Sequence, residues 1–127
     1  MIAEVKEEHI TCESKSFRTR KLKFLVDTGA QKNIIKISAL DGRVIINESD
    51  KRNIKGINKI PISTFGTARV SISIQGATRV IKFDIVNDDF DIPEAEIIGR
   101  SFLKENRVHW NFEEDILSIP EDNKTKL

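Results

Sequence analysis

The stretch Phe24-Leu25-Val26-Asp27-Thr28-Gly29-Ala30 joins an apolar run to a carboxylate, a hydroxyl and a glycine. Upstream residues alternate between Lys21, Lys23 and apolar neighbours, which predicts a strand that ends at Asp27. Gly29 allows a close backbone approach or a positive φ directly after the carboxylate. Taken alone, the tripeptide 27–29 is equally typical of a β-turn at a strand end.

The rest of the chain also favours strands. It contains 20 Ile, 7 Val and 7 Phe, against 6 Leu and 6 Ala, and β-branched and aromatic residues suit a pleated surface. Alternation on both sides of Gln75-Gly76-Ala77 predicts a hairpin over residues 69–86. A second alternating run at 108–112 is followed by a turn and a return at 116–119.

One short helix is predicted at about residues 101–106, with Ser101 as its N-cap. We therefore expect an all-β domain of six to nine short strands and one helix. No linker divides residues 1–127, so the sequence predicts a single domain with its core at about 9–119. Residues 41–60 are predicted to be loops and a mobile hairpin. The first eight and last seven residues are charged, which predicts frayed ends.

Composition limits the functional classes. The net charge is +1, so no strong global field attracts nucleic acid or an anionic membrane. The 39% hydrophobic and 32% charged residues are typical of a soluble globular protein. No apolar run approaches the length of a membrane span. The N-terminus lacks an apolar signal core, which suggests a cytosolic chain or a piece of a longer polypeptide.

The chemistry of residues 27–29 points to a carboxylate that acts on water. A positioned carboxylate can serve as a general base. Two carboxylates about 3 Å apart share one proton, so one member accepts a proton while the other polarises a carbonyl. This chain has only one Asp-Thr-Gly and no Asp-Ser-Gly. The same chemistry would require a two-fold homodimer that brings two copies of Asp27 together.

About seventy residues later, Ile97-Ile98-Gly99-Arg100 follows an acidic stretch and precedes the predicted helix. With these two motifs the chain resembles the retropepsins, the homodimeric aspartic proteases of retroviruses and long-terminal-repeat retrotransposons. The stretch 54–60 is similar to the flap of that family, and Phe65-Gly66-Thr67 looks more like the gypsy-type and errantivirus enzymes. The resemblance covers about residues 9–119 and implies a small closed barrel of the acid-protease type, one lobe per chain.

The resemblance also implies roles for individual residues. Those of the catalytic half-site are Asp27, Thr28 and Gly29. Those expected to contact substrate are Ala30, Gln31 and the flap residues Gly56, Ile57, Asn58 and Ile60. Those with a structural or dimer role are Ile98, Gly99 and Arg100. No metal and no organic cofactor is implied.

The sequence departs from the retroviral pattern at Gln31, where many retroviral enzymes have an aspartate that pairs with the arginine of the second motif. Arg100 must then use Gln31, a backbone carbonyl or another acid. Lys32 and Asn33 follow, which predicts a less acidic subsite than in retroviral relatives.

Several other residues invite competing interpretations. Cys12 is interpreted as an incidental thiol on an exposed strand, His109 as a surface or interface residue, and Trp110 as part of the core. One cluster of basic residues could either bind RNA or form a solvated face, and its composition favours the solvated face. The cluster comprises Lys15, Arg18, Arg20, Lys21 and Lys23. An acidic cluster lacks cation-site spacing and is interpreted as a solvated loop; it comprises Asp84, Asp88, Asp89, Asp91, Glu94 and Glu96.

Three hypotheses follow. The first is a homodimeric aspartic endopeptidase that cleaves a retroelement polyprotein, in the cytoplasm or within virus-like particles. The second is a domesticated or inactive retropepsin fold that serves as a dimerisation or interaction module, against which the intact Asp27-Thr28-Gly29 argues. The third is an RNA-binding β-domain that uses residues 15–23.

Overall fold

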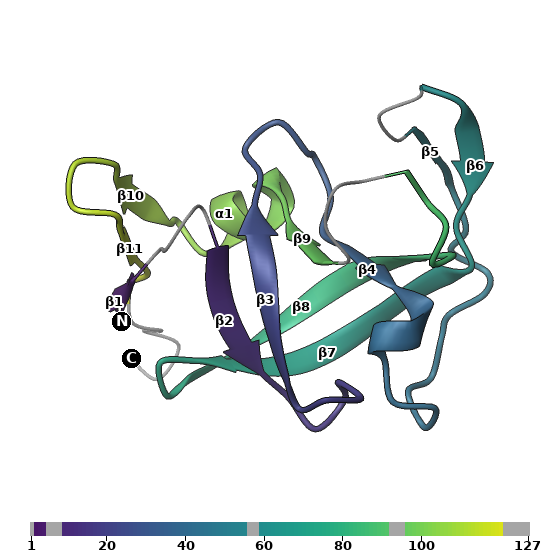
Figure 1. Ribbon diagram of the computed structural model, residues 1–127, viewed down its shortest axis with the longest axis horizontal. Helices are drawn as coiled ribbons and strands as arrows, with labels where there is room; N and C mark the ends of the chain where they lie inside the picture. Colours follow the sequence, from purple (N-terminus) through teal and green to yellow (C-terminus); the bar gives the residue numbers. More distant parts are fainter. Residues whose placement is uncertain (1, 5–8, 56–58, 92–95, 121–127) are drawn as a thin grey trace, which may run out of the picture.

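A long hairpin forms one wall of the barrel in the computed structural model, which describes residues 2–4, 9–55, 59–91 and 96–120 (Figure 1). β7 (Gly66–Ile74) and β8 (Ala77–Val86) pair antiparallel along their whole length. The two residues of the turn, Gln75 and Gly76, have φ values of 50° and 82°. Positive φ at both turn positions matches the twist of the flanking strands. The hairpin predicted at 69–86 is confirmed and begins three residues earlier.

The barrel closes in the order β2-β3-β9-β4-β8-β7, with β7 returning to β2. β3 and β9 are parallel, as are β4 and β8, whereas β4 and β9 are antiparallel. The ends of β3 and β9 therefore lie side by side, and β4 follows on the other side of β9. The remaining barrel strands are β2 (His9–Glu13), β3 (Lys21–Val26), β4 (Ile34–Lys36) and β9 (Glu96–Ile98).

Two smaller sheets flank the barrel (Figure 1). One is a three-stranded sheet of β1 (Ile2–Glu4), β11 (Ile116–Ser118) and β10 (His109–Asn111) in the order β1-β11-β10. The other is a hairpin of β5 (Asn53–Lys55) and β6 (Pro61–Ser63). The helical elements are the 3₁₀ helix η1 (Ile37–Ala39) and α1 (Arg100–Glu105). No helix among the described residues is long and apolar enough to cross a bilayer.

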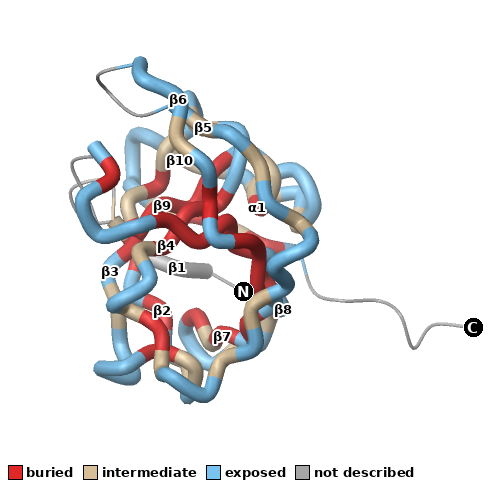
Figure 2. The backbone as a smooth tube through the Cα atoms, turned by 90° about the vertical axis from the view of Figure 1, so that its right-hand side faces the viewer, coloured by how far each residue is buried: buried red, intermediate tan, exposed pale blue. Residues whose placement is uncertain are grey.

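Aromatic rings fill the centre of the barrel, where the backbone is coloured as buried in Figure 2. The stacked rings of Phe24 and Phe83 have centroids 5.5 Å apart, and the ring of Phe17 is tilted against that of Phe24 with a centroid distance of 5.6 Å. All three side chains are fully buried. Because inward residues alternate along β7 and β8, Val70, Ile72, Ile81 and Ile85 surround these rings in the same core.

The structure corrects several expectations about the elements. The described residues contain eleven strands, more than the six to nine predicted, because several strands of three residues have no clear alternation. Ile2–Glu4 pair with β11, so the prediction of a frayed N-terminus is wrong for these residues. α1 begins at Arg100 rather than Ser101, and its N-cap is Gly99, which has no side chain to cap with. The predicted frayed stretch 121–127 lies outside the described residues.

Two predictions about single side chains also differ. Cys12 is fully buried in the barrel core, not exposed, because it lies on the inward face of β2. Trp110 is half-buried and packs against the edge of the core, where its ring stacks on Phe112 at 4.5 Å. Phe112 itself is largely exposed.

The aromatic stack predicts a large penalty for truncation. We expect Phe83→Ala to lower the free energy of unfolding by about 3–5 kcal/mol, since it removes a fully buried ring and leaves a cavity. Chemical denaturation followed by circular dichroism measures the change. Val80→Ala is the control on the same strand, because Val80 is 59% exposed. Equal losses for the two variants would contradict this account of the core.

Candidate active site

Asp27 follows β3 and is held in place by the neighbouring strand. Its N–H donates to the carbonyl oxygen of Ile98 at 2.9 Å, which extends the parallel pairing of β3 and β9 by one residue. The N–H of Gly29 donates to Oδ1 of Asp27 at 2.8 Å, and the N–H of Ala30 donates to its carbonyl oxygen at 3.2 Å. The carboxylate is half-buried, whereas Thr28 and Gly29 are exposed. One carboxylate oxygen is thus fixed by the backbone at an accessible loop.

Residues 99–101 are hydrogen-bonded to the loop that follows Asp27. The N–H of Arg100 donates to the carbonyl oxygen of Ala30 at 2.7 Å, and the N–H of Ser101 donates to that of Gln31 at 2.9 Å. Gly99 is required here by close approach, because a Cβ at this position would lie 2.4 Å from the carbonyl oxygen of Lys32 and 2.7 Å from that of Ala30. The two sequence motifs therefore form one unit.

Asn33 joins this unit to β8. Its side chain is buried, its Oδ1 accepts from the N–H of Gly99 at 2.9 Å, and its Nδ2 donates to the carbonyl oxygen of Lys82 at 3.1 Å. Its own carbonyl oxygen accepts from the N–H of Asp84 at 2.8 Å. The interpretation of Asn33 as a subsite residue is therefore wrong: the side chain lies beneath the loop. Its position directly before the apolar Ile34-Ile35 is the one sequence signal that favoured burial.

Arg100 does not use the partners that the sequence suggested. Its side chain is exposed, and its guanidinium has no hydrogen bond or ion pair with any residue that the structure describes. Gln31 is exposed as well. The second motif thus contacts the first through backbone hydrogen bonds and through apolar packing of Ile97 near Leu25 and Ala30, whereas the arginine side chain is exposed.

A small apolar cluster lies beside the loop and outside the main core. Its buried members are Ile34, Val86, Phe90 and Ile97, and the half-buried side chains packed on them are Leu25, Ala30, Ile54 and Ile62. Ala30 belongs to the Asp27 loop, whereas Ile54 and Ile62 belong to the β5–β6 hairpin. This cluster thus links the loop that follows Asp27 to the β5–β6 hairpin through apolar packing.

The β5–β6 hairpin occupies the place that the resemblance assigned to the flap. Its strands pair from Asn53↔Ser63 to Lys55↔Pro61. Ile60 is 61% exposed, as expected of a residue that could meet a substrate. The other predicted flap residues, Gly56, Ile57 and Asn58, lie outside the described residues.

Charged side chains gather at the base of that hairpin. Nε of Arg52 lies 3.0 Å from Oδ1 of Asp84, whose side chain is 3% exposed. Burial raises the pKa of Asp84, and the charge of Arg52 opposes this shift. The pKa of Asp50 is lowered, first by the ammonium of Lys82 at 2.8 Å and then by the hydroxyl of Thr67 at 3.1 Å.

The interpretation of the acidic cluster as a solvated loop is wrong for two of its members. Asp84 lies within β8, and Glu96 lies within β9; both are buried. Asp88, Asp89 and Asp91 are exposed as expected, and Glu94 lies outside the described residues. The described part of the chain holds no group of three or more His, Cys, Asp or Glu side chains arranged for a metal ion.

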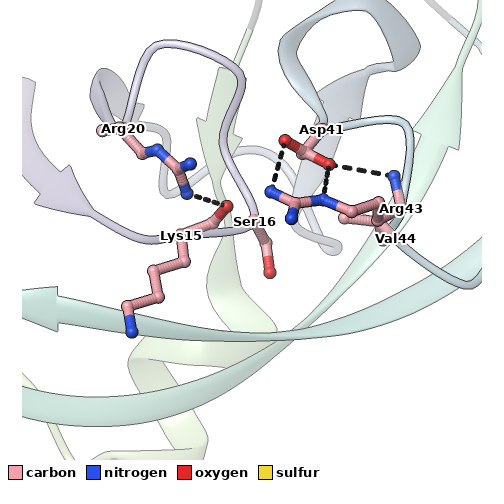
Figure 3. Close-up of a pocket in the computed structure, with 6 residues that line it drawn as sticks. All are labelled: Lys15, Ser16, Arg20, Asp41, Arg43 and Val44. Atoms are coloured by element: carbon pink, nitrogen blue, oxygen red, sulfur yellow. Dashed lines mark hydrogen bonds and ion pairs between the residues drawn. The ribbon is translucent and has the colours of Figure 1, made fainter.

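A hollow lies far from Asp27, at the other end of β3, where Arg20 precedes the strand (Figure 3). The guanidinium groups of Arg20 and Arg43 are held by neighbouring residues. Arg43 forms a two-point contact with Asp41 at 2.9 and 3.2 Å, and Arg20 donates to the carbonyl oxygen of Lys15 at 2.6 Å. Arg43 lowers the pKa of Asp41 to about 2. This hollow shares part of the basic cluster but no residue of the Asp27 site.

The close approach at Gly99 yields a prediction. Gly99→Ala should lower the free energy of unfolding by about 2 kcal/mol or more, because the added methyl group meets two backbone carbonyls that cannot rotate away. Gly42→Ala is the matched control, since a Cβ at Gly42 meets nothing within 4 Å. Urea denaturation of both variants measures the difference, and a Gly99→Ala protein as stable as the wild type would refute the packing described.

Cys12 yields a second prediction. Burial raises the pKa of its thiol to about 12, so the nucleophilic thiolate is scarce in the folded protein. We expect a thiol-reactive dye to label the folded chain on the order of 100-fold more slowly than the chain unfolded in denaturant at the same pH. Rapid labelling of the folded protein would contradict the burial of this side chain.

Comparison with known proteins agrees with this geometry. Residues 8–111 match the family model of the retroviral aspartyl protease. The chain is 37% identical over 107 residues to the retrovirus-related Pol polyprotein from transposon 412 of Drosophila melanogaster. That match covers 81% of this chain and 8% of the polyprotein, so the chain spans less than a tenth of its relative.

Among solved structures, the fold is similar to the retroviral protease-like domain of Ddi1 from Leishmania major, with a TM-score of 0.62, 19% identity and 98% of each chain covered. At that identity the likeness concerns the fold alone. The family assignment rests on sequence similarity. The matched residues 8–111 include both the Asp27 motif and the Gly99 motif, and the structure joins these motifs by hydrogen bonds. The chain belongs to the retropepsin family, the aspartyl proteases of retroviruses and LTR retrotransposons.

Proposed function

We propose that this chain is an aspartic endopeptidase that acts as a homodimer and cleaves a retroelement polyprotein. The observation that carries the proposal is the Asp27 carboxylate, presented on an exposed loop with one oxygen held by the N–H of Gly29 at 2.8 Å. Membership of the retropepsin family supports the reaction class. The relative in the transposon 412 polyprotein supports the substrate class.

The proposed reaction needs two copies of Asp27 that share one proton. The ionised copy accepts a proton from water, and the resulting hydroxide attacks the peptide carbonyl while the protonated copy donates to the carbonyl oxygen. Collapse of the tetrahedral intermediate breaks the C–N bond, and the amine leaves with a proton from the pair. The acid and the base both come from side chains, so the proposal uses no metal and no organic cofactor.

The homodimer follows from the single Asp-Thr-Gly in the chain, because one carboxylate cannot serve as both acid and base at once. Thr28 is proposed to brace the paired loops across the two-fold axis, and Gly29 to contact the substrate backbone. Both residues are exposed, as an interface role requires before assembly. Gly99 and Ile98 support the loop from behind through the contacts described above.

The proposed substrate is a peptide in extended conformation, bound between the Asp27 loop and the β5–β6 hairpin. Ala30 and Ile54 belong to the apolar cluster that joins these two elements, which favours apolar side chains next to the cleaved bond. Gln31 and Ile60 are exposed at the two sides of this path and are proposed to contact the peptide. Gly56, Ile57 and Asn58 are proposed to do so from the tip of the flap.

An inactive dimerisation or interaction module remains the alternative, and the likeness to the Ddi1 domain is compatible with it. The intact Asp27-Thr28-Gly29 favours the protease, since a module that only assembles has no need of a carboxylate held by a backbone N–H.

Substitution of Asp27 tests the proposal. We expect Asp27→Asn to lower the cleavage rate of a diverse peptide library by about 10³-fold or more at mildly acidic pH, because an amide can neither accept the proton of water nor share one with its partner. Mass spectrometry of the products identifies the cuts. The matched control is Asp88→Asn, an exposed aspartate outside the Asp27 loop, which should cleave like the wild type.

Mixing the two proteins tests the homodimer. Excess Asp27→Asn protein should suppress wild-type cleavage, because mixed dimers carry only one competent carboxylate. Cleavage that is independent of Asp27 would overturn the proposal. Absence of cleavage by a wild-type dimer would favour the interaction module.

A further inference from the structure

The base of the β5–β6 hairpin is tied to the barrel by a buried ion pair. Arg52 lies directly before β5, and its Nε is 3.0 Å from Oδ1 of Asp84 in β8. The Asp84 side chain is 3% exposed and that of Arg52 is 32% exposed. The two atoms meet as an ion pair without the alignment of a hydrogen bond. The pair therefore spans two elements that are distant in sequence and contacts little solvent on the Asp84 side.

Arg52 also closes the hairpin. Its N–H donates to Oγ1 of Thr64 at 3.1 Å, and its carbonyl oxygen accepts from the N–H of Thr64 at 2.8 Å. These contacts join the residue before β5 to the residue after β6. Any movement of the Arg52 backbone therefore moves both strands of the hairpin together.

Asp84 connects to the other side of the site. Its N–H donates to the carbonyl oxygen of Asn33, whose Oδ1 accepts from the N–H of Gly99. Gly99 packs against the loop that follows Asp27. A continuous series of contacts thus runs from the support of the Asp27 loop, through β8, to the hairpin.

A second set of contacts fixes the segment before Arg52. Asp50 accepts from Nζ of Lys82 at 2.8 Å and from Oγ1 of Thr67 at 3.1 Å, and it lies 3.4 Å from the Arg52 guanidinium. Lys82 and Thr67 belong to β8 and β7, on the outer face next to Asp84. The approach to the hairpin is therefore anchored at two neighbouring acids.

A buried ion pair joins two elements at a high cost in desolvation free energy. Burial of a carboxylate costs free energy that its attraction to a partner repays only in part, and apolar side chains of similar size hold surfaces together at lower cost. The raised pKa of Asp84 has the same cause, since burial outweighs the charge of Arg52. What the ion pair adds is a fixed direction for the hairpin.

We propose that Asp84 and Arg52 are positioning residues that orient the β5–β6 hairpin, hold Ile54 and Ile62 against the apolar cluster beside Asp27, and so set the affinity for substrate. The effect on substrate rests on the proposed peptidase function. The orientation of the hairpin does not.

Hydrogen–deuterium exchange of Asp84→Asn tests the anchor without any enzymatic assay. The substitution keeps the shape of the side chain and removes its charge. At neutral pH we expect the backbone amides of β5 and β6 to exchange about threefold faster or more than in the wild type, with β2 and β3 unchanged. Asp41→Asn is the matched control, because it removes the acid of another Asp–Arg pair in the hollow at the opposite end of β3. Equal exchange in wild type and Asp84→Asn would overturn the proposal.

Thermodynamic stability separates positioning from a structural role. A raised pKa means that the folded protein binds the Asp84 proton more tightly than the unfolded chain does, so its contribution to stability is lost as the pH rises. The Asp84→Asn protein should therefore be no less stable than the wild type at neutral pH. A large loss of stability with exchange accelerated throughout the barrel would show a structural role instead.

Acidification supplies a further readout. Protonation of Asp84 in the wild type should remove the exchange difference between the two proteins as the pH falls, and because its pKa is raised this should begin at a higher pH than for an exposed aspartate. The charged groups that share the pocket around Asp84 are Lys32, Arg52, Arg69, Lys82 and Glu105, and Asp50 lies beside Arg52. Glu105→Gln is the control for the other carboxylate of that pocket and should leave the profile unchanged. A difference that persists at low pH would count against the ion pair as its cause.

Peptidase kinetics connect the anchor to function. For a peptide cleaved by the wild type, Asp84→Asn should raise KM by about threefold or more and leave kcat within about twofold, since the hairpin binds substrate and does not touch the reacting atoms. A fall in kcat with unchanged KM would contradict the role in affinity. If the wild type cleaves nothing, the proposed function fails, while the exchange experiment still decides whether the pair orients the hairpin.

Discussion

The buried carboxamide of Asn33 is the contact on which the rest of the site depends. It accepts from Gly99 and donates to β8, so it fills the space between two barrel strands and the loop that follows Asp27. An amide side chain suits this place because it carries both a donor and an acceptor, and it meets a backbone carbonyl oxygen on one side and a backbone N–H on the other. The Asn33 amide thus supports from beneath the loop that presents the Asp27 carboxylate.

Much of this arrangement could be predicted from the sequence where periodicity or a motif carried it. The alternation around Gln75-Gly76 gave the hairpin, and the pairing of the 27–29 and 97–100 motifs gave the family and the position of Asp27. What the sequence did not reveal is which polar residues are buried. Asp84 is a single polar residue among apolar neighbours, and Asn33 stands between Lys32 and Ile34; the burial of both follows from partners distant in the chain. The burial of Cys12 could not be predicted for a related reason. β2 is only five residues long and has charged neighbours, so its sequence does not show which face points into the core.

Two kinds of contact support the site, and they differ in what they tolerate. The contacts around Gly99 are short backbone hydrogen bonds in a space without room for a methyl group, so they define one geometry. The contacts at the hairpin are ionic, and all of their side chains except that of Asp84 are partly exposed. In the proposed protease, the backbone contacts would fix the Asp27 loop, and the ionic contacts would fix the direction of the hairpin while leaving its exposed side chains free to adapt to a peptide.

The stacking of Trp110 on Phe112 has a spectroscopic consequence. Trp110 is the one tryptophan of a chain without tyrosine, and it lies in the small sheet of β1, β10 and β11 rather than in the barrel. Intrinsic fluorescence therefore observes that sheet and not the Phe24–Phe83 core. Emission recorded beside far-ultraviolet circular dichroism would follow two regions of one molecule with two probes, and any separation of the two transitions would reveal that the small sheet opens independently of the barrel.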